Sequence, residues 1–434
     1  MIASRNMLIA VGVLLVAGLA VAVFQTGYAA WTAALLVLVG LAGWDLWVVR
    51  RRPAPRLKRQ VDNSLPLGVV SEIQLEVTFA DGRGGRVELY DGVPVELGAN
   101  DPRVDAKVQR DQLLEATYTI EPHQRGRFEI EEAYLRQYGP LGLMARQIRI
   151  GQPQKVRVVP NFRAVSRYAL LAVADKTSAI GVRRLRRRGE GMEFDCLREY
   201  REGDQLRQID WKATARHRRL IARQYEDERH QQVMLVFDCG RRMRAIDGEL
   251  SHFDHALNAG LLLSYVALQQ GDSVTVSTFG GVDRWVARQR GPRAVEAIVD
   301  RTFDLQTTTQ PSDFSGVAER VAVRQKRRAL VVLLTNLYDA EPDELDRALA
   351  LLNERHLVLI ASLREEGVQR MADGPIRDLN DALQVGATHH FLNHRRKVHA
   401  RLRRAGAMVL DVTPSELSVQ LVNRYLEIKR SGEL

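Results

Sequence analysis

One short segment of the chain, between residues 193 and 216, concentrates charged side chains that are capable of chemistry. Its carboxylates are Glu193, Asp204 and Asp210. Three such groups can hold a divalent cation or act as general acid and base, as in a metal-dependent hydrolase or nuclease. Arginines alternate with them, at Arg198, Arg207 and Arg216. Because guanidinium groups pair bidentately with carboxylates, we favour a structural ion-pair knot in which Asp210 also caps a helix that begins at Trp211.

A second candidate site follows the run Val233–Phe237, which is apolar at every position. Such a run is typical of a buried parallel strand, and open α/β sheets bind their ligands beyond the carboxyl ends of the strands. The next residues are Asp238-Cys239-Gly240-Arg241-Arg242-Met243. Asp238 is therefore a candidate ligand-binding residue.

Other motifs of chemistry do not occur in the sequence. There is no G-x-x-x-x-G-K-[ST] phosphate loop, no G-x-S-x-G elbow and no H-E-x-x-H. His389, His390 and His394 have a spacing that suits a metal on a helix, but a polar helix face is the favoured interpretation. The two cysteines, Cys196 and Cys239, are too few for a disulfide framework or a zinc cluster, so we expect them to be reduced and structural. No cofactor and no enzymatic activity are expected.

Two apolar runs near the start of the chain must be accommodated before these sites can be placed. Met7–Phe24 and Tyr28–Val49 each have about the 20 residues that cross a bilayer as a helix. Only Gln25-Thr26-Gly27 separates them, so we expect a transmembrane helical hairpin and not a cleaved signal peptide. Asp45 is the one charge inside. We interpret it as a carboxylate at headgroup depth, and the alternative is a functional intramembrane carboxylate.

The basic residues that flank these runs predict the orientation of the hairpin. Arg5 precedes the first run, the turn carries no charge, and six basic residues follow the second run: Arg50, Arg51, Arg52, Arg56, Lys58 and Arg59. By the positive-inside rule, both termini face the cytoplasm of a bacterial inner (plasma) membrane. The same six residues are expected to form a lipid-facing cluster that binds anionic membrane lipid.

The rest of the chain divides by its hydrophobic periodicity. Residues 53–162 alternate apolar and polar positions in short runs, as in Ile73–Phe79, which predicts a small antiparallel β-sandwich. From residue 231 to 434, apolar strands alternate with amphipathic helices, which predicts a mostly parallel, doubly wound α/β domain. The expected parts are therefore the hairpin (1–52), the β-sandwich-like domain (53–162), the charged segment (163–230) and the α/β domain (231–434).

A basic run, Arg183–Arg188, lies within the third part and contributes to the net charge of +10. It has no interleaved aromatic residues on which bases could stack, so nucleic acid is not an expected partner. A solvated loop, an anionic lipid surface and an acidic protein all remain open as explanations, and nucleic-acid binding by this run is kept as a weaker alternative.

The charged segment also resembles the signature of the domain-of-unknown-function 58 family, G-x-E-F-x-x-L-R-x-Y-x-x-G-D-x-x-R-x-I-D-W-x-x-x-A-R. The matching residues are Gly191, Glu193, Phe194, Leu197, Arg198, Tyr200, Gly203, Asp204, Arg207, Ile209, Asp210, Trp211, Ala215 and Arg216. The element Tyr138–Leu143 and the two apolar runs are also typical of the family. The resemblance implies a membrane protein that works beside a MoxR-type AAA+ ATPase as an adaptor, in the assembly of protein complexes or in envelope maturation.

The α/β part further resembles a von Willebrand factor A-like domain, which carries Asp-x-Ser-x-Ser after its first strand to hold a divalent cation. In this chain Gly240 and Arg242 replace the two serines, and Thr335-Asn336 stands where an aspartate is usual. One of Thr307–Thr309 is expected to supply the remaining hydroxyl. Because glycine offers no oxygen and a guanidinium repels a cation, we expect that the metal site has been lost. Arg242 is then expected to meet a carboxylate of a partner protein directly.

Overall fold

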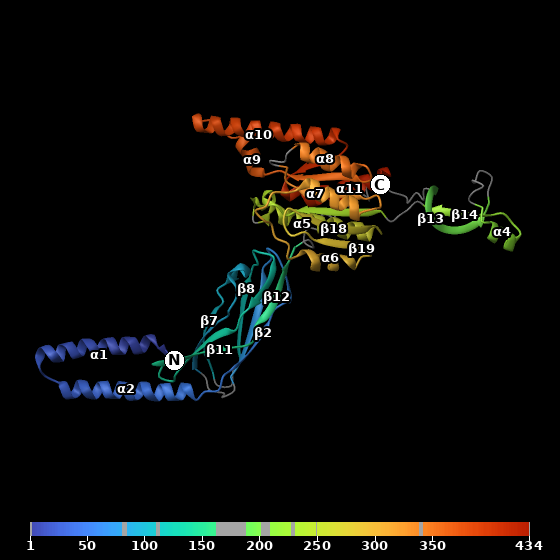
Figure 1. The fold of residues 1–434 in the computed structure, drawn as a ribbon. Helices are drawn as coiled ribbons and strands as arrows, with labels where there is room; N and C mark the ends of the chain where they lie inside the picture. The colour runs from blue at the N-terminus through green and yellow to red at the C-terminus, as the bar shows by residue number, and fades with distance from the viewer. Residues whose placement is uncertain are drawn as a thin grey trace. The chain divides into compact units, whose positions relative to one another are not determined.

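A computed structural model of the chain describes residues 2–79, 85–109, 113–161, 188–200, 209–226, 231–248, 250–337 and 342–433. It divides into two compact units, Met1–Val159 and Pro160–Leu434 (Figure 1). Most of the basic run predicted at 183–188 lies outside the described residues, as do Gly203, Asp204 and Arg207 of the signature.

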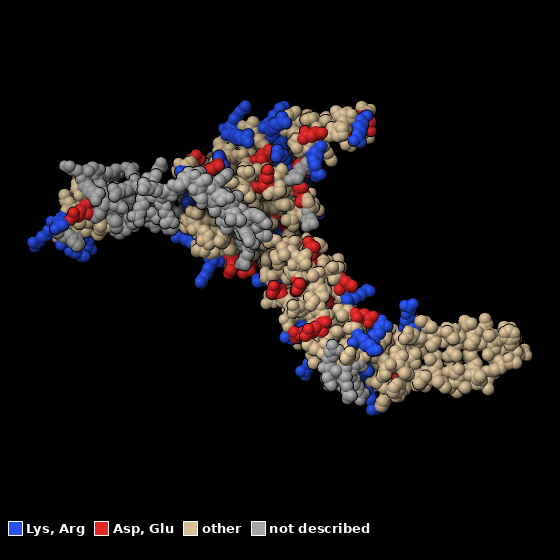
Figure 2. Space-filling view, turned by 180° about the vertical axis from the view of Figure 1, so that it is seen from behind, with Lys and Arg blue, Asp and Glu red and all other residues tan. Residues whose placement is uncertain are grey.

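The first unit begins with two helices that are long and apolar enough to cross a membrane, α1 (Arg5–Phe24) and α2 (Tyr28–Arg50). Their bounds confirm the predicted runs and the three-residue turn. The turn reverses the chain because Gln25 and Gly27 take left-handed backbone conformations, with φ of 53° and 86°. The Trp31 indole donates to the carbonyl of Leu14 at 2.8 Å and joins the two helices. The visible face of the hairpin is almost free of charge (Figure 2).

Three sheets follow in the first unit. The strands of the first, in spatial order, are β1 (Ile2–Ala3), β11 (Met144–Ile150), β10 (Ala133–Tyr138), β5 (Gly85–Tyr90) and β7 (Arg103–Val108). The second has β2 (Arg56–Gln60), β4 (Ser71–Thr78), β8 (Leu114–Ile120) and β6 (Ala99–Asn100). The third has β3 (Ser64–Pro66), β12 (Gln154–Val159) and β9 (Gly126–Ile130). All neighbours are antiparallel except β3 and β12, so the antiparallel expectation holds with one exception.

A buried ion pair joins the second sheet to the loop after β5. The side chain of Arg59 donates from Nε to Asp91 Oδ2 at 3.0 Å, and the hydroxyl of Tyr118 donates to the same oxygen at 2.6 Å. The Arg59 side chain is 4% exposed and that of Asp91 is 0% exposed. The sequence pattern Asp91-Gly92 indicated only a turn. The prediction that Arg59 faces lipid is wrong, because its charge is neutralised inside the protein.

Asp45 attaches the hairpin to this unit. Its side chain is fully buried, and its carboxylate accepts backbone hydrogen bonds from Leu141 and Met144 at 2.9 and 2.8 Å and from Leu143 at 2.9 Å. These amides belong to the turn between β10 and β11, the Tyr138–Leu143 element. In this structure the Asp45 carboxylate holds the turn. Its depth in a membrane stays a prediction.

The start of α1 is bound to the same turn. The Ser4 amide donates to the carbonyl of Leu143 at 3.0 Å, its hydroxyl donates to the carbonyl of Gly142 at 2.5 Å, and the same hydroxyl caps α1 at Met7. Strand β1 pairs with β11 directly before it. Since the start of α1 and the last turns of α2 are both bonded to this turn, the hairpin and the sheets fall within one compact unit, Met1–Val159.

The second unit contains a hairpin and an α/β sheet. The hairpin is β13 (Arg188–Glu199) with β14 (Ile221–Glu226), and α4 (Trp211–His217) lies between them in sequence. The sheet has the order β19 (Trp285–Arg290), β18 (Ser273–Phe279), β15 (Gln232–Asp238), β20 (Leu330–Thr335), β21 (Leu357–Leu363) and β22 (Met408–Val412). All its pairings are parallel except that of the edge strand β19, as the predicted alternation requires.

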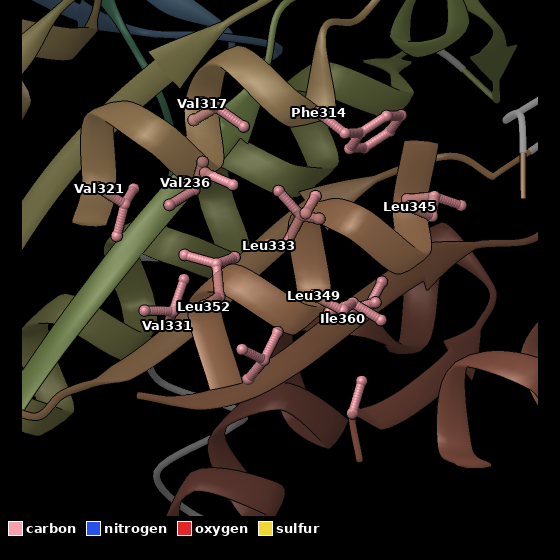
Figure 3. Close-up of a cluster of buried hydrophobic side chains, with 14 of the residues drawn as sticks. Val236, Phe314, Val317, Val321, Val331, Leu333, Leu345, Leu349, Leu352 and Ile360 are labelled. Atoms are coloured by element: carbon pink, nitrogen blue, oxygen red, sulfur yellow. The ribbon is translucent and has the colours of Figure 1, made fainter. Parts of the chain in front are cut away.

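Helices cover both faces of this sheet. On one face, α7 (Phe314–Arg324), α8 (Pro342–Asn353) and α10 (Leu379–Arg404) bury a core with Met234, Val236 and Leu333 of the central strands (Figure 3). On the other, α5 (His252–Gln269) packs on β15 so closely that a Cβ on Gly260 would lie 2.4 Å from the Phe237 ring. The remaining helices are α6 (Ala294–Thr302), α9 (Glu366–Ala372) and α11 (Pro414–Ser431).

The hydrogen bonds to Asp45 predict which backbone amides lose their protection against hydrogen exchange when this carboxylate is removed. Replacing Asp45 with Ala leaves three buried amides without an acceptor, at about 1–3 kcal/mol each. Gly139→Ala places a Cβ 2.1 Å from Asp45 Oδ1 and separates the same groups. We expect amide hydrogen exchange at Leu141, Leu143 and Met144 to accelerate by about 100-fold or more in both variants of the detergent-solubilised chain.

The matched control is Gly43→Ala, on the same helix, where a Cβ has no neighbour within 4 Å. Its exchange is expected to match that of the wild type. Unchanged protection in Asp45→Ala would show that the carboxylate does not hold the turn.

Candidate functional site

The topology places Asp238 where an α/β sheet binds ligands. Asp238 is the last residue of β15, and the chain continues from β15 to β18 on one side and later to β20 on the other. Because the strand order reverses at β15, the carboxyl ends of β15 and β20 are the position at which sheets of this kind bind ligands. The sequence placed Asp238 at this position correctly.

The carboxylate of Asp238 is fully buried and surrounded by donors. Its Oδ1 accepts from the Gly240 amide at 2.8 Å and from the Ser312 hydroxyl at 2.7 Å, and its Oδ2 accepts from Thr335 Oγ1 at 2.6 Å. Burial raises the pKa of Asp238, while the hydrogen bonds from Thr335, Ser312 and Gly240 and the charge of Arg242 lower it. The donors therefore offset part of the cost of burying a carboxylate.

Ser312 is the functional residue that sequence reasoning missed. Thr307–Thr309 were expected to provide the hydroxyl, but Thr308 donates to the carbonyl of Gly280 at 2.6 Å instead. Ser312 lies next to Asp313, the residue that caps α7, and its approach to Asp238 depends on the path of the loop before that helix. Four hydroxyl residues occur within six positions here, and only the fold distinguishes them.

Gly240 is explained by the position of Ser312. A Cβ at residue 240 would lie 2.5 Å from Ser312 Oγ and 3.0 Å from Asp238 Oδ1. The serine that a von Willebrand factor A-like pattern would place at 240 therefore cannot fit while Ser312 occupies this space. The hydroxyl has been supplied from another loop.

Asn336 belongs to a neighbouring polar cluster. Its amide lies 3.5 Å from His252 Nδ1, and its Oδ1 accepts from Arg395 at 3.4 Å. Arg395 is buried and also pairs with Asp411 at 2.9 Å. Although burial raises the pKa of Asp411, hydrogen bonds from His399 and Arg395 hold it below its usual range. Burial also lowers the pKa of His252 to about 4, so this imidazole is neutral at neutral pH.

Arg242 lies partly buried against its own domain. Its guanidinium carbon is 5.5 Å from the centre of the Phe314 ring, and its Nη1 has no solvent exposure. The arginine thus supplies positive charge to Asp238 from within, which does not favour the expected contact with a partner carboxylate. Its neighbours Arg241 and Arg244 are exposed.

The signature residues are only partly described. Asp210 Oδ1 accepts from the amides of Lys212 and Ala213, both at 3.0 Å, and caps α4, as predicted. Trp211 is 67% exposed and Arg216 is exposed, while the Tyr200 amide pairs with the carbonyl of Leu220 at 2.9 Å.

Glu193 and Arg198 lie in β13, but their side chains are outside the described set. The ion-pair knot and the metal site in the signature both stay predictions. Within the described ranges, no group of three or more His, Cys, Asp or Glu residues is placed to hold a metal ion.

The basic residues after α2 divide into two kinds. Arg50, Arg51, Arg56 and Lys58 are exposed, with the Arg51 guanidinium 4.2 Å from the centre of the Trp47 ring. Arg52 is 9% exposed, its backbone carbonyl accepts from Arg146 at 2.7 Å, and it does not belong to a lipid-facing cluster. With Arg59 also buried, four of the six predicted cluster residues remain available to lipid.

Residues 196–408 match the family described as "Protein of unknown function DUF58". The chain carries a DUF58 domain over this range, in agreement with the resemblance of its signature. A comparison with curated proteins found no match.

A comparison with solved structures matched parts of this chain to several proteins. The CARDB domain of the PF1109 protein from Pyrococcus furiosus is 12% identical over 25% of this chain and 90% of its own, with a TM-score of 0.18. The SrpA adhesin from Streptococcus sanguinis is 15% identical over 25% of this chain and 57% of its own, with a TM-score of 0.17. Trypsin-activated α2-macroglobulin from Escherichia coli is 11% identical over 86% of this chain and 24% of its own, with a TM-score of 0.21. With scores this low, none carries an argument about this chain.

The hydrogen bonds donated to Asp238 predict that removing one donor lowers the free energy of unfolding of the second unit. Thr335→Val keeps the side-chain shape and removes one donor from a buried carboxylate, which should destabilise the second unit by about 1–3 kcal/mol. Native-state hydrogen exchange of the backbone amides in β15 and β20 measures this loss of stability. Thr309→Val, on an exposed residue of the loop before α7, is the control and should leave the exchange unchanged. Equal exchange in the two variants would contradict the assigned hydrogen bond.

His252 predicts a pH dependence. In the unfolded state it binds a proton near its ordinary pKa of 6.5, and in the folded state only near 4. Between these values the unfolded state binds more protons, so stability is complete above pH 6.5 and falls as the pH drops toward 4, by up to about 3 kcal/mol. Exchange of the same amides, followed from pH 7 to 4.5 and corrected for intrinsic rates, should lose most of this slope in His252→Asn. His389→Asn, on an exposed histidine, should keep it.

Proposed function

We propose that this chain is a two-span protein of the bacterial inner membrane that acts as an adaptor and not as an enzyme. Its β-sandwich-like and von Willebrand factor A-like domains would then both lie in the cytoplasm. The support is the apolar hairpin together with exposed basic residues at one end of it: Arg5 begins α1, Arg50 ends α2 and Arg51 follows it. The hairpin turn has no charge.

The strand order supports the von Willebrand factor A-like assignment. If the six strands are numbered by their order along the chain, their order across the sheet is 3-2-1-4-5-6, and the antiparallel strand β19 lies at one edge. An aspartate ends the first strand and a threonine ends the fourth, and the two side chains are hydrogen-bonded. Domains of this kind bind proteins at this edge of the sheet, and we assign the same role to it here.

The observation that carries the proposal is the saturation of Asp238 by groups of its own domain. With both carboxylate oxygens occupied by Gly240, Ser312 and Thr335, the carboxylate serves the loop architecture. What the edge presents to a partner is the loop after it, where Arg241 and Arg244 are exposed. A surface of this kind suits acidic groups on a partner protein.

Apolar side chains accompany these arginines. Ile246 is 75% exposed, and Val282, in the turn after β18, is 56% exposed. The two loops touch, because a Cβ on Gly280 would lie 2.8 Å from the Gly240 amide nitrogen. Apolar residues within a charged rim are typical of protein interfaces. By the family resemblance, the partner is a MoxR-type AAA+ ATPase or its client.

Affinity capture of the tagged full chain from membranes in a mild detergent tests the proposal. The wild type should recover an AAA+ ATPase, identified by mass spectrometry. The variant Arg241→Glu/Arg244→Glu should reduce that recovery at least about 10-fold, as expected for reversing charges at an interface. The matched control is Lys326→Glu/Arg327→Glu, which reverses two exposed charges before β20, at the opposite edge of the sheet. No ATPase with the wild type, or equal recovery by both variants, would overturn the proposal.

A further inference from the structure

A large groove lies between the beginning of α1 and the first sheet. Its volume is about 1300 Å³, and it lies beside the turn that binds Ser4 and Asp45. Its charged lining comes from four elements: α1 gives Arg5, β5 gives Arg86 and Glu88, β7 gives Lys107, and β10 gives Arg136. Neither the adaptor proposal nor the signature uses this groove.

The groove carries excess positive charge. Glu88 is neutralised by Arg136 at 3.0 Å and Arg86 at 3.4 Å, and it also accepts from the Tyr138 hydroxyl at 2.6 Å. Arg86 is further paired with Asp105 at 2.6 Å. Arg5 and Lys107 have no ion-pair partner among the residues that the structure describes. An anion that enters the groove therefore meets two cations that no described carboxylate neutralises.

The groove is apolar on the side of the hairpin. Ile9, in the second turn of α1, lines it and is 55% exposed, and Ile2 and Leu141 line it at 41% and 43%. Beyond them the exposed surface of α1 continues as an uninterrupted apolar helix face. The groove thus changes from cationic to apolar along one direction, toward the helix pair.

We propose that this groove binds the headgroup of an anionic phospholipid, with the phosphate between Lys107 and Arg5 and the acyl chains along Ile9 of α1. The inference rests on the proposal that the hairpin spans the membrane. A phospholipid has the same order of charge and apolar surface, and the volume suffices for a glycerophosphate headgroup and the first carbons of its chains. A soluble phosphate compound would leave the apolar side of the groove exposed to water. The site differs from the four exposed basic residues after α2, which form an open surface.

Native mass spectrometry of the purified full chain in a non-ionic detergent tests this site. Phosphatidylglycerol is titrated against phosphatidylcholine at equal concentrations, and the lipid-bound fraction is measured for each. We expect a preference for phosphatidylglycerol, and we expect Lys107→Glu to weaken its binding about 10-fold. Lys155→Glu, which makes the same charge change on an exposed residue of β12 outside the groove, should bind as the wild type does.

Three outcomes would overturn the inference: equal binding of the two lipids, equal affinity of the two variants, or displacement of the lipid by millimolar glycerol 1-phosphate, which would indicate a site for soluble phosphates. A Lys107→Arg variant should bind as the wild type does, which separates loss of charge from misfolding. Because the titration needs neither an ATPase nor a known orientation, its failure leaves the adaptor proposal standing. Failure of the affinity capture likewise leaves the lipid site standing.

Discussion

The burial of the Asp45 carboxylate is the constraint on which the first unit depends. A carboxylate that is removed from water must be surrounded by hydrogen-bond donors. Here the donors are three backbone amides of one turn, those of Leu141, Leu143 and Met144. The turn must then keep its shape, which requires Gly139 to lack a Cβ, and it must stay in register with both helices through Ser4. One charge on an apolar helix thus determines how a hairpin is joined to a folded domain.

Asp238 repeats this arrangement in the second unit with different donors. One amide and two hydroxyls from three separate segments meet on it, so a single side chain joins the loop after β15, the loop before α7 and the end of β20. The loops around it are hydrogen-bonded to the carboxylate where they approach it, and the loop after β15 is exposed at Arg241 and Arg244.

The basic character of the chain has several separate origins. Arg59 pairs with the buried carboxylate of Asp91, Arg395 pairs with the partly buried carboxylate of Asp411, and Arg242 packs on an aromatic ring. Residues at the ends of the helix pair, in the groove beside α1 and on the loop after β15 keep their charges exposed, and on these exposed charges the proposed lipid and protein partners depend. Net charge alone would not have distinguished these roles, because solvation and pairing decide which charges act outside the protein.

The features of this protein that depend on residues close together in the sequence could be predicted from the sequence alone. The two apolar helices, the alternation of strands and helices after residue 231, the cap at Asp210 and the place of Asp238 all follow from residue types within a few positions of one another. Strand β7, Arg103–Val108, shows the same period of two, because Arg103, Asp105 and Lys107 alternate with apolar residues. Helix α9 is too short to show a period.

Tertiary structure alone decided which distant groups meet. Asp45 binds amides about a hundred residues away, Ser312 and not a threonine reaches Asp238, and Arg52 and Arg59 are buried although they lie in a basic run. A side chain's exposure and partners depend on the path of the whole chain, and the energy of a buried charge depends on donors that no local pattern can name.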